Sequence, residues 1–267
     1  MIHRHLYEAR CPRQTETVYA YQPRPSEVAI TDWKRCVQLA FIRGARHLAI
    51  AFRENTEVPQ SRTPASFNDH YMAQPEPLWD IVGKAFKDIP ENITTRFAKA
   101  IADAEDISIF GDGSVKDSRG AHATRVYADG LFAEGTEYIE AANVTSGDPA
   151  TITSLRSETA SALSGLYILQ MLTDYYSFQI TAKVHFYYDN CKCLRRLDTL
   201  REFKYFADPM VTDYDVWAEM KRILAHQMDI TIEVHHVKAH QDLHEPYADL
   251  PRDAQVNCDM DKAAETM

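Results

Sequence analysis

Four acidic residues between positions 112 and 261 lie beside segments with strand or helix patterns. They are Asp112, Glu158, Asp189 and Asp261. Carboxylates that are brought together repel one another unless cations lie between them. Hard divalent cations such as Mg²⁺ prefer an all-oxygen environment of this kind. The four residues therefore predict a divalent-metal site, provided that the fold gathers their side chains at one place.

The first of these acids belongs to a region that the hydrophobic pattern predicts to be three strands. A short apolar strand leads into a turn that contains Asp112, and Asp129-Gly130 is a strong hairpin signal between the second and third strands. The expected strands are Ile107–Phe110, Ala121–Tyr127 and Leu131–Ala142, with the first turn at Gly111–Ser114.

The other three acids lie in a region where strands alternate with helices. Ser157 is the expected N-cap of a helix that carries Glu158 in its first turn. The later elements are strand Val184–Tyr188 before Asp189, helix Asp213–Ala225, strand Ile230–Val237 and a final helix from Ala254. This order predicts a mixed sheet covered by helices, with the later strands parallel to the first. Strand ends and helix starts converge at one edge of such a sheet, so the four acids could meet there.

Residues 1–104 are expected to form an N-terminal extension of unknown role, and residues 105–267 one domain. The extension reads as irregular up to Pro25, and it holds no motif for chemistry. Its helical candidates are Ser26–Phe52, Leu78–Phe86 and Ile93–Ala104, with a proline-rich loop at Pro59–Pro77.

The charge of the 267-residue chain is uneven. The net charge is −10, with +1 on residues 1–105 and −11 on residues 106–267. An acidic domain argues against nonspecific binding to phosphates, which depends on Lys and Arg, but it suits a site that concentrates cations.

The cysteines and the hydropathy indicate an intracellular chain, nuclear or cytoplasmic. Five cysteines with scattered spacing predict reduced thiols. No apolar run is long enough to span a bilayer, and the start lacks the features of a secretory signal, so no membrane partner is expected.

Five short motifs, in order, resemble those of ribonuclease H. They are Phe110-Gly-Asp112-Gly-Ser114, Arg156-Ser-Glu158-Thr-Ala160, Tyr188-Asp189-Asn190, His236-Val-Lys-Ala-His240-Gln-Asp242 and Asn257-Cys-Asp-Met-Asp261. Each motif alone is weak, but five in the right order on matching elements make a strong signal. Residues 106–267 look most like the ribonuclease H-like domains attached to retroelement reverse transcriptases. The implied fold class is α/β, a ribonuclease H-like mixed five-stranded sheet flanked by helices.

The resemblance implies a nuclease with two Mg²⁺ ions, for which Mn²⁺ is a possible substitute. Asp112 would bridge both ions, Glu158 and Asp189 would hold one, and Asp261 the other. His240 would aid proton movement or product release. The implied substrate is the RNA strand of RNA–DNA hybrids, and a further implied partner is the polymerase region of a reverse transcriptase.

Two departures from the family pattern affect this hypothesis. The glycine-rich stretch that usually follows the first motif is replaced by Val115–Arg119, which puts the grip on the RNA strand in doubt. The last helix offers both Asp259 and Asp261, which cannot both point into one site because they are two residues apart. The spacing from Asn257 favours Asp261.

Each site residue also has a purely structural interpretation. Asp112 could be a turn residue, Glu158 could stabilise a helix dipole, and Asp189-Asn190 could cap a helix. Asp261 could be surface charge, and His240 an ordinary loop histidine. Of His235 and His236, one is expected to face the core without a metal role.

Two rival functions remain open at this stage. The domain could keep the fold as a catalytically inactive connection module, or as a module that binds nucleic acid or protein, which the charge of −11 and the missing glycines favour. Alternatively, it could act on another nucleic acid, because other nucleases and strand-transfer enzymes share this fold and a fold does not determine function.

Overall fold

The computed structural model describes residues 6–10, 17–21, 65–74, 78, 81–128, 137–147, 152–200, 213–227 and 230–267. The chain divides into two compact units, Met1–Arg62 and Thr63–Met267. In the described residues, no helix is both long and apolar enough to cross a membrane. Three of the five cysteines fall in this part of the chain, namely Cys191, Cys193 and Cys258, and all three are free thiols.

The first unit contains a two-stranded antiparallel ladder where the sequence predicted irregular structure. Strand β1 (Leu6–Arg10) pairs with β2 (Thr17–Tyr21). The second strand, Thr-Val-Tyr-Ala-Tyr, is rich in the β-branched and aromatic residues that favour strands, and this local preference outweighs the nearby prolines. The predicted helix at 26–52 lies outside the described residues.

The second unit is built on a mixed five-stranded sheet, which confirms the predicted fold class. The strand order is β5-β4-β3-β6-β7. Strands β3, β4 and β5 are antiparallel neighbours, whereas β6 and β7 run parallel to β3. The strands are β3 (Asp106–Lys116), β4 (Arg119–Ala128), β5 (Tyr138–Val144), β6 (Lys183–Tyr188) and β7 (Thr231–His236).

Strand β3 is longer than the sequence suggested. The expected turn at Gly111–Ser114 is wrong, because these residues continue the strand and pair with Ala121–Thr124 of β4. The chain reverses instead at Asp117 and Ser118, both with positive φ, as a tight two-residue hairpin requires. The expected turn at Asp129-Gly130 lies outside the described residues.

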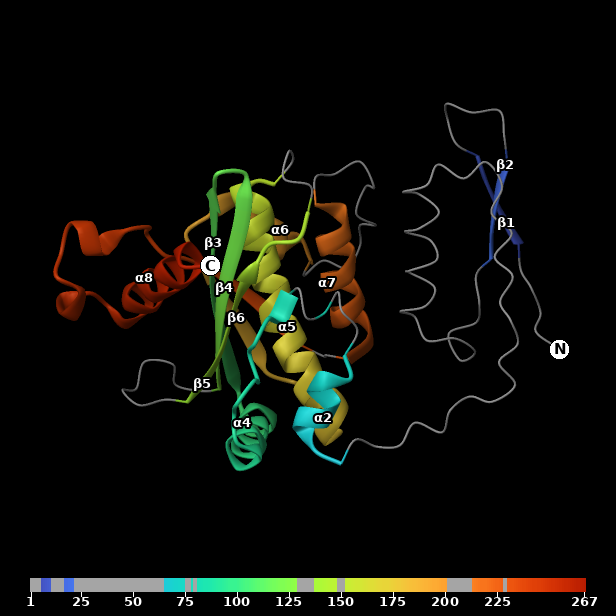
Figure 1. Cartoon of the computed structure of the whole chain (residues 1–267), viewed down its shortest axis with the longest axis horizontal. Helices are drawn as coiled ribbons and strands as arrows, with labels where there is room; N and C mark the ends of the chain where they lie inside the picture. The colour runs from blue at the N-terminus through green and yellow to red at the C-terminus, as the bar shows by residue number, and fades with distance from the viewer. Residues whose placement is uncertain are drawn as a thin grey trace. The chain divides into compact units, whose positions relative to one another are not determined.

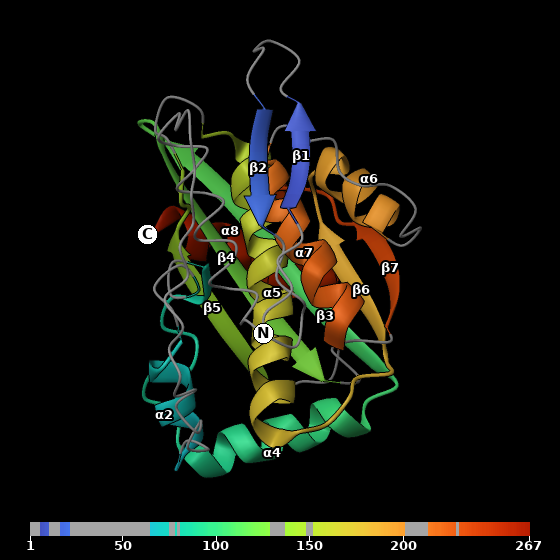
Figure 2. The same ribbon diagram turned by 90° about the vertical axis from the view of Figure 1, so that its right-hand side faces the viewer.

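Helix α5 (Ser154–Tyr176) is the centre of the larger hydrophobic core. It lies against β3 and β4 on one face of the sheet (Figures 1 and 2), and residues from Ser157 to Leu169 are all buried. Helix α7 (Tyr214–Gln227) packs beside it. A helix enclosed on all sides lacks a polar stripe, which explains its weakly amphipathic sequence.

Two further helices cover α5 from residues that the sequence assigned to the extension. Helix α4 (Glu91–Asp103) contributes Phe97 and Ile101 to this core, in agreement with the predicted helix at 93–104. Helix α2 (Phe67–Met72) falls in the predicted loop at 59–77, where Ser66 accepts a hydrogen bond from the Asp69 backbone N–H and caps it. Of the predicted helix at 78–86, Leu78, Ile81 and Val82 are helical, and a turn follows from Gly83.

The opposite face of the sheet is covered by helix α8 (Arg252–Glu265) (Figure 1). Its residues Val256 and Met260 pack on Phe110 and Tyr127 in a smaller core. Two short 3-10 helices, η1 (Gln241–Leu243) and η2 (Tyr247–Asp249), precede it. Helix α6 (Cys191–Leu200), which directly follows β6, was not predicted.

The start of α5 is held by an arginine that contacts two acids of another segment. Arg156 donates hydrogen bonds to Asp213 at 3.2 Å and to both carboxylate oxygens of Asp215, at 2.9 and 2.7 Å. The Asp213 side chain is only 4% exposed. Because Glu158 is two residues further along the helix, this contact also orients the residue that the sequence singled out.

We predict that Arg156→Met lowers the free energy of unfolding by about 3 kcal/mol, because it leaves Asp213 as a buried acid whose remaining ion pair among the described residues is a longer contact of 3.9 Å to Arg196. Urea denaturation monitored by circular dichroism measures this loss. The matched control is Arg96→Met, which breaks an exposed pair with Glu137 and is expected to cost less than about 1 kcal/mol. Equal losses in the two variants would contradict the prediction.

Candidate metal centre

Three of the four predicted acids meet in the structure. Oxygens of Asp112, Glu158 and Asp189 all lie within 4.8 Å of one another. The three residues come from a strand, a helix and the end of another strand, so the fold alone brings them together. Asp112 and Glu158 are buried, with exposed fractions of 6% and 3%.

The pairing of the strands creates room for this cluster. Strand β6 pairs with β3 only as far as Phe110, whereas β4 follows β3 to Lys116. Asp112 therefore lies on a stretch of β3 whose second edge has no strand beside it. Asp189, directly after β6, reaches Asp112 at this point.

Two glycines in β3 allow α5 to approach closely enough for Glu158 to join. A Cβ atom on Gly113 would collide with the backbone at Ser157 and Glu158, and one on Gly111 would collide with Ser161 and Tyr188. The sequence predicts these glycines to lie in a turn. However, two glycines spaced two residues apart in an apolar strand pattern also indicate that another backbone approaches closely.

A pair of hydroxyl groups joins α5 to the end of β6, directly before Asp189. Ser161 of α5 donates a hydrogen bond of 3.0 Å to the hydroxyl of Tyr188, which is the last residue of β6 and is fully buried. Neither residue was predicted as part of the site.

Burial and mutual repulsion make the carboxyl groups hard to ionise. Burial, followed by the charge of Asp189, raises the pKa of Asp112 to about 7. Burial and then the charges of Asp112 and Asp189 raise the pKa of Glu158 well above its ordinary value. Burial also raises the pKa of Asp189, although His240 opposes this shift. A cation among the three groups would remove this cost of ionisation.

The chemistry of the site fits a hard divalent cation. The oxygen Oε2 of Glu158 is buried and has no hydrogen-bond partner within the described part of the chain, which is uncommon for a polar atom in a folded protein. Three carboxylates supply only oxygen ligands, the type that Mg²⁺ prefers.

The fourth acid, Asp261, lies next to the cluster. Its charge raises the pKa of both Asp112 and Asp189, and its Oδ2 lies 3.1 Å from Nδ1 of His240. Asp259 is turned elsewhere and pairs with Arg125 at 3.0 Å and with Tyr247 at 2.9 Å. Of the two acids on this helix, the geometry therefore favours Asp261.

Asp112, Glu158 and Asn190 differ in how well the purely structural interpretations fit them. Asp112 is in a strand and not in a turn. The expected N-cap at Ser157 is wrong, because the cap of α5 is Thr153, four residues earlier, and Glu158 is then beyond the first turn. Asn190 does cap a helix, since its side chain accepts hydrogen bonds from the backbone N–H groups of Lys192 and Cys193.

The expectation that His235 or His236 faces the core is wrong. His235 is partly exposed and His236 is exposed. Nε2 of His236 lies 3.1 Å from the backbone oxygen of Asp189, so this histidine helps to hold the segment that carries Asp189. His240 is also exposed, and it has positive φ.

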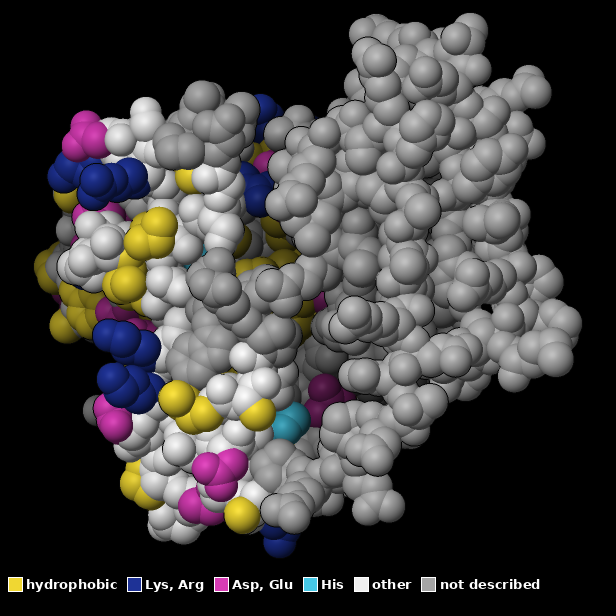
Figure 3. All heavy atoms as spheres, turned by 45° about the vertical axis from the view of Figure 1, so that its right-hand side comes forward, with side chains coloured by type: hydrophobic (Ala, Val, Ile, Leu, Met, Phe, Trp, Pro, Cys, Tyr) yellow, Lys and Arg dark blue, Asp and Glu magenta, His cyan; other side chains and the backbone are white. Residues whose placement is uncertain are grey.

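The surface carries charges of both signs. On the face drawn in Figure 3, Lys and Arg side chains of the described residues are interspersed with Asp and Glu. Near the cluster in sequence, exposed cations stand at the tip of the β3–β4 hairpin and at the start of α6: Lys116, Arg119, Lys192 and Arg195.

Comparisons with known proteins found solved structures to which this chain is similar. No protein-family model and no curated protein matches the chain. The LC11-RNase H1 from compost, solved with an RNA/DNA hybrid, is 15% identical, with 60% of this chain and 94% of that chain covered at a TM-score of 0.41. The protease-reverse transcriptase of prototype foamy virus is 14% identical, with coverage of 60% and 20% and a TM-score of 0.41. The RNase H1 of the archaeon Halobacterium salinarum is 13% identical, with coverage of 60% and 95% and a TM-score of 0.36.

These likenesses are too distant to say anything about substrate or activity. The assignment of a ribonuclease H-like fold rests on the order and direction of the five strands and on the helices on both faces.

The raised pKa values predict how pH changes stability without metal. A carboxyl group whose pKa is raised by folding supports the fold below its unfolded pKa, about 4, and loses this contribution as pH rises through its folded pKa. With a chelator present, the free energy of unfolding of the parent, relative to Asp112→Asn, should therefore fall between about pH 4 and about pH 8. Thermal unfolding of both proteins across this range measures the difference, and a difference that does not vary with pH would contradict it.

Added Mg²⁺ should reverse this loss. At about 100 times its dissociation constant, an ion that binds only the folded chain stabilises it by about 2.7 kcal/mol. The rise in Tm should be larger at about pH 8 than at about pH 5, and smaller in Asp112→Asn at both.

The close approach at Gly113 gives a separate prediction. Gly113→Ala should lower the free energy of unfolding by about 1–3 kcal/mol, because the new methyl group meets the backbone of α5. It should also reduce the rise in Tm with Mg²⁺, since Glu158 moves with the helix. Ser114→Ala, next on the strand, is the control and should change stability by less than about 0.5 kcal/mol. Unchanged stability in Gly113→Ala would show that the contact is not required.

Proposed function

We propose that residues 105–267 form a metal-dependent endonuclease domain that hydrolyses the RNA strand of RNA–DNA hybrids and derives from a retroelement. The observation that carries the proposal is the meeting of Asp112, Glu158 and Asp189 within 4.8 Å. A purely structural role does not account for two buried acids beside a third, partly exposed one, because their repulsion opposes folding.

Each acid has a proposed part in the site. Asp112, Glu158 and Asp189 would hold divalent ions, Mg²⁺ by preference and Mn²⁺ as a substitute, and Asp261 would complete the ligand set from α8. Such ions activate a water molecule and stabilise the leaving oxygen in an in-line displacement. The oxygen Oε2 of Glu158, which has no hydrogen-bond partner among the described residues, is a proposed ligand atom.

His240 is the proposed group for proton movement. Its Nδ1 lies against Asp261, and its imidazole is 58% exposed, so it can exchange protons both with the site and with solvent. His240 would thus act on the water or the leaving group.

Exposed cations that lie near the acids in the sequence would hold the phosphate backbone. Lys116 and Arg119 pair across the tip of the β3–β4 hairpin, and Lys192 and Arg195 begin α6 directly after Asp189 and Asn190. These local charges reconcile a nucleic-acid substrate with the charge of −11 on the domain. RNA would be distinguished from DNA through contacts to its 2′-hydroxyl groups. The polymerase region of a reverse transcriptase is the proposed protein partner.

The test is cleavage of a labelled RNA–DNA hybrid in Mg²⁺ by the full chain and by Asp112→Asn. Metal-ion catalysis contributes several kcal/mol to the transition state, so the variant should lose roughly a thousandfold in kcat/KM. The control is Asp117→Asn, which removes the same charge at the tip of the same hairpin, where positive φ suits asparagine. It should keep the activity of the parent.

The products and substrates decide between the alternatives. Hydrolysis by this mechanism leaves 5′-phosphate and 3′-hydroxyl ends on the RNA, with duplex DNA intact. Cleavage of duplex DNA instead would indicate a nuclease of another specificity. Equal activity in Asp112→Asn and the parent would remove the assignment, and a parent that binds Mg²⁺ without cleaving would support an inactive module.

A further inference from the structure

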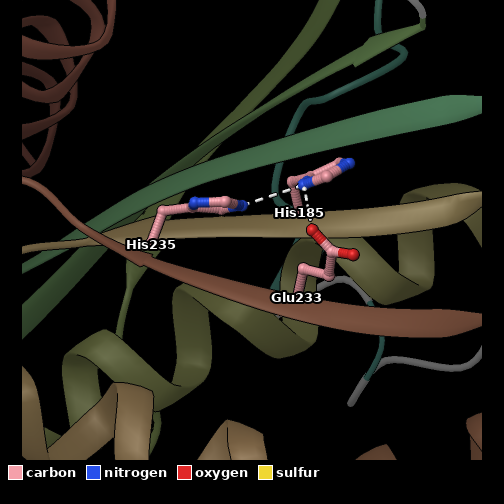
Figure 4. Close-up of side chains that lie close together, drawn as sticks. All are labelled: His185, Glu233 and His235. Atoms are coloured by element: carbon pink, nitrogen blue, oxygen red, sulfur yellow. Dashed lines mark hydrogen bonds and ion pairs between the residues drawn. The ribbon is translucent and has the colours of Figure 1, made fainter.

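A second group of potential metal ligands lies on β6 and β7, apart from the acids described above. Figure 4 shows His185 between Glu233 and His235. Nδ1 of His185 lies 2.9 Å from Nε2 of His235 and 3.5 Å from Oε2 of Glu233. The three ligand atoms lie within 4.8 Å of one another.

Strand pairing explains why these side chains converge. Side chains point to the same face of a sheet at every second residue. In the ladder of β6 and β7, His185 is opposite Glu233 and Tyr187 is opposite His235. The imidazole of His185 is therefore flanked by the two β7 side chains.

A fourth residue, Asp106 at the start of β3, orients the ring of His185. The second ring nitrogen of His185, Nε2, lies 2.8 Å from Oδ1 of Asp106. A carboxylate that accepts a hydrogen bond from Nε2 fixes the tautomer and leaves the lone pair on Nδ1, the atom that faces Glu233 and His235. Metal-ligating histidines commonly have such a carboxylate partner.

The ring of His235 is also held in place. It stacks on Tyr187 with the ring centroids 4.5 Å apart and the planes at 16°, and Tyr187 in turn stacks on Phe110. Positioned side chains lose little conformational entropy on binding an ion. All three ligands remain partly exposed, so an ion could enter from solvent.

We propose that His185, Glu233 and His235 bind a divalent transition-metal ion of the Zn²⁺ type. Two imidazoles and a carboxylate form a donor set that zinc accepts, with water in the fourth position. Imidazole ligands also separate this site from the first one, because Mg²⁺ prefers oxygen. The proposal does not depend on the nuclease function.

The distance between the two ring nitrogens needs only a small adjustment for zinc. Zinc–nitrogen bonds of about 2.0–2.1 Å in a tetrahedral site place two ligand nitrogens about 3.3 Å apart. The rings of His185 and His235 are 0.4 Å closer than this, at 2.9 Å, because they share a hydrogen bond that the ion would replace. An ion would tie the edge strand β7 to β6, and through Asp106 to β3.

The two sites are separate in space. His185 lies four residues before Asp189, which corresponds to about 13 Å along a strand. The histidine site lies within the two parallel strands, from His185 opposite Glu233 to His235 opposite Tyr187, whereas the acids lie at or beyond the end of β6. Zinc binding at the histidines can therefore be measured while Mg²⁺ saturates the acids.

The test is calorimetric titration of the full chain with Zn²⁺ in excess Mg²⁺. His185→Gln and His235→Gln should each lose one zinc equivalent, or more than about a hundredfold in its affinity. Asp106→Asn, which removes only the orienting carboxylate, should lose about tenfold to a hundredfold. The matched control is His244→Gln, at an exposed loop histidine, and it should bind zinc as the parent does. Equal stoichiometry and affinity in all four variants would overturn the proposal.

A second measurement covers the case in which a variant fails to fold. Crystals of the parent soaked in Zn²⁺ give anomalous diffraction at the zinc absorption edge. A peak between His185 and His235 supports the site. Zinc bound only at other positions overturns it.

Discussion

Ionised carboxylates that are buried side by side repel one another, and the architecture around β3 depends on how that repulsion is relieved. The fold forces Asp112 and Glu158 out of water and against Asp189. In the absence of a cation, the pKa values of all three carboxyl groups are raised, so each group is harder to ionise than it would be in water. The same arrangement is a preformed set of oxygen ligands for an ion. Because a bound ion relieves the repulsion between the carboxylates, that relief adds to the free energy of binding.

The close contact between a helix and a strand is what creates this arrangement. Gly111 and Gly113 have no side chains, so α5 can lie directly on β3, and the early end of β6 leaves Asp112 accessible from that side. Arg156 then holds the beginning of the helix against Asp213 and Asp215. Residues far apart in the sequence thus fix the position of Glu158. None of these supporting residues has a proposed part in the chemistry.

Local patterns in the sequence were sufficient for the strand order of the sheet and for the three acids that meet beside it, because strand alternation and motif order are local properties. They failed where a tertiary contact decides the outcome. The Gly111–Ser114 segment looks like a turn, yet pairing with β4 keeps it extended. Ser157 looks like a cap, yet Thr153 begins the helix. The pair of His185 with His235 could not be seen at all, since it depends on which strands are neighbours and in what register.

The packing of α2 and α4 has a consequence for where the chain can be cut. These helices precede residue 105, yet Phe67, Phe97 and Ile101 are almost completely buried in the same core as α5. A shortened protein that starts at β3 would expose the apolar surface of α5 that they cover, including the ring of Tyr176 that stacks on Phe67. Contiguous apolar patches of that kind promote self-association. Self-association of such a fragment would then result from the loss of α2 and α4, which cover the core, and not from any property of the acids.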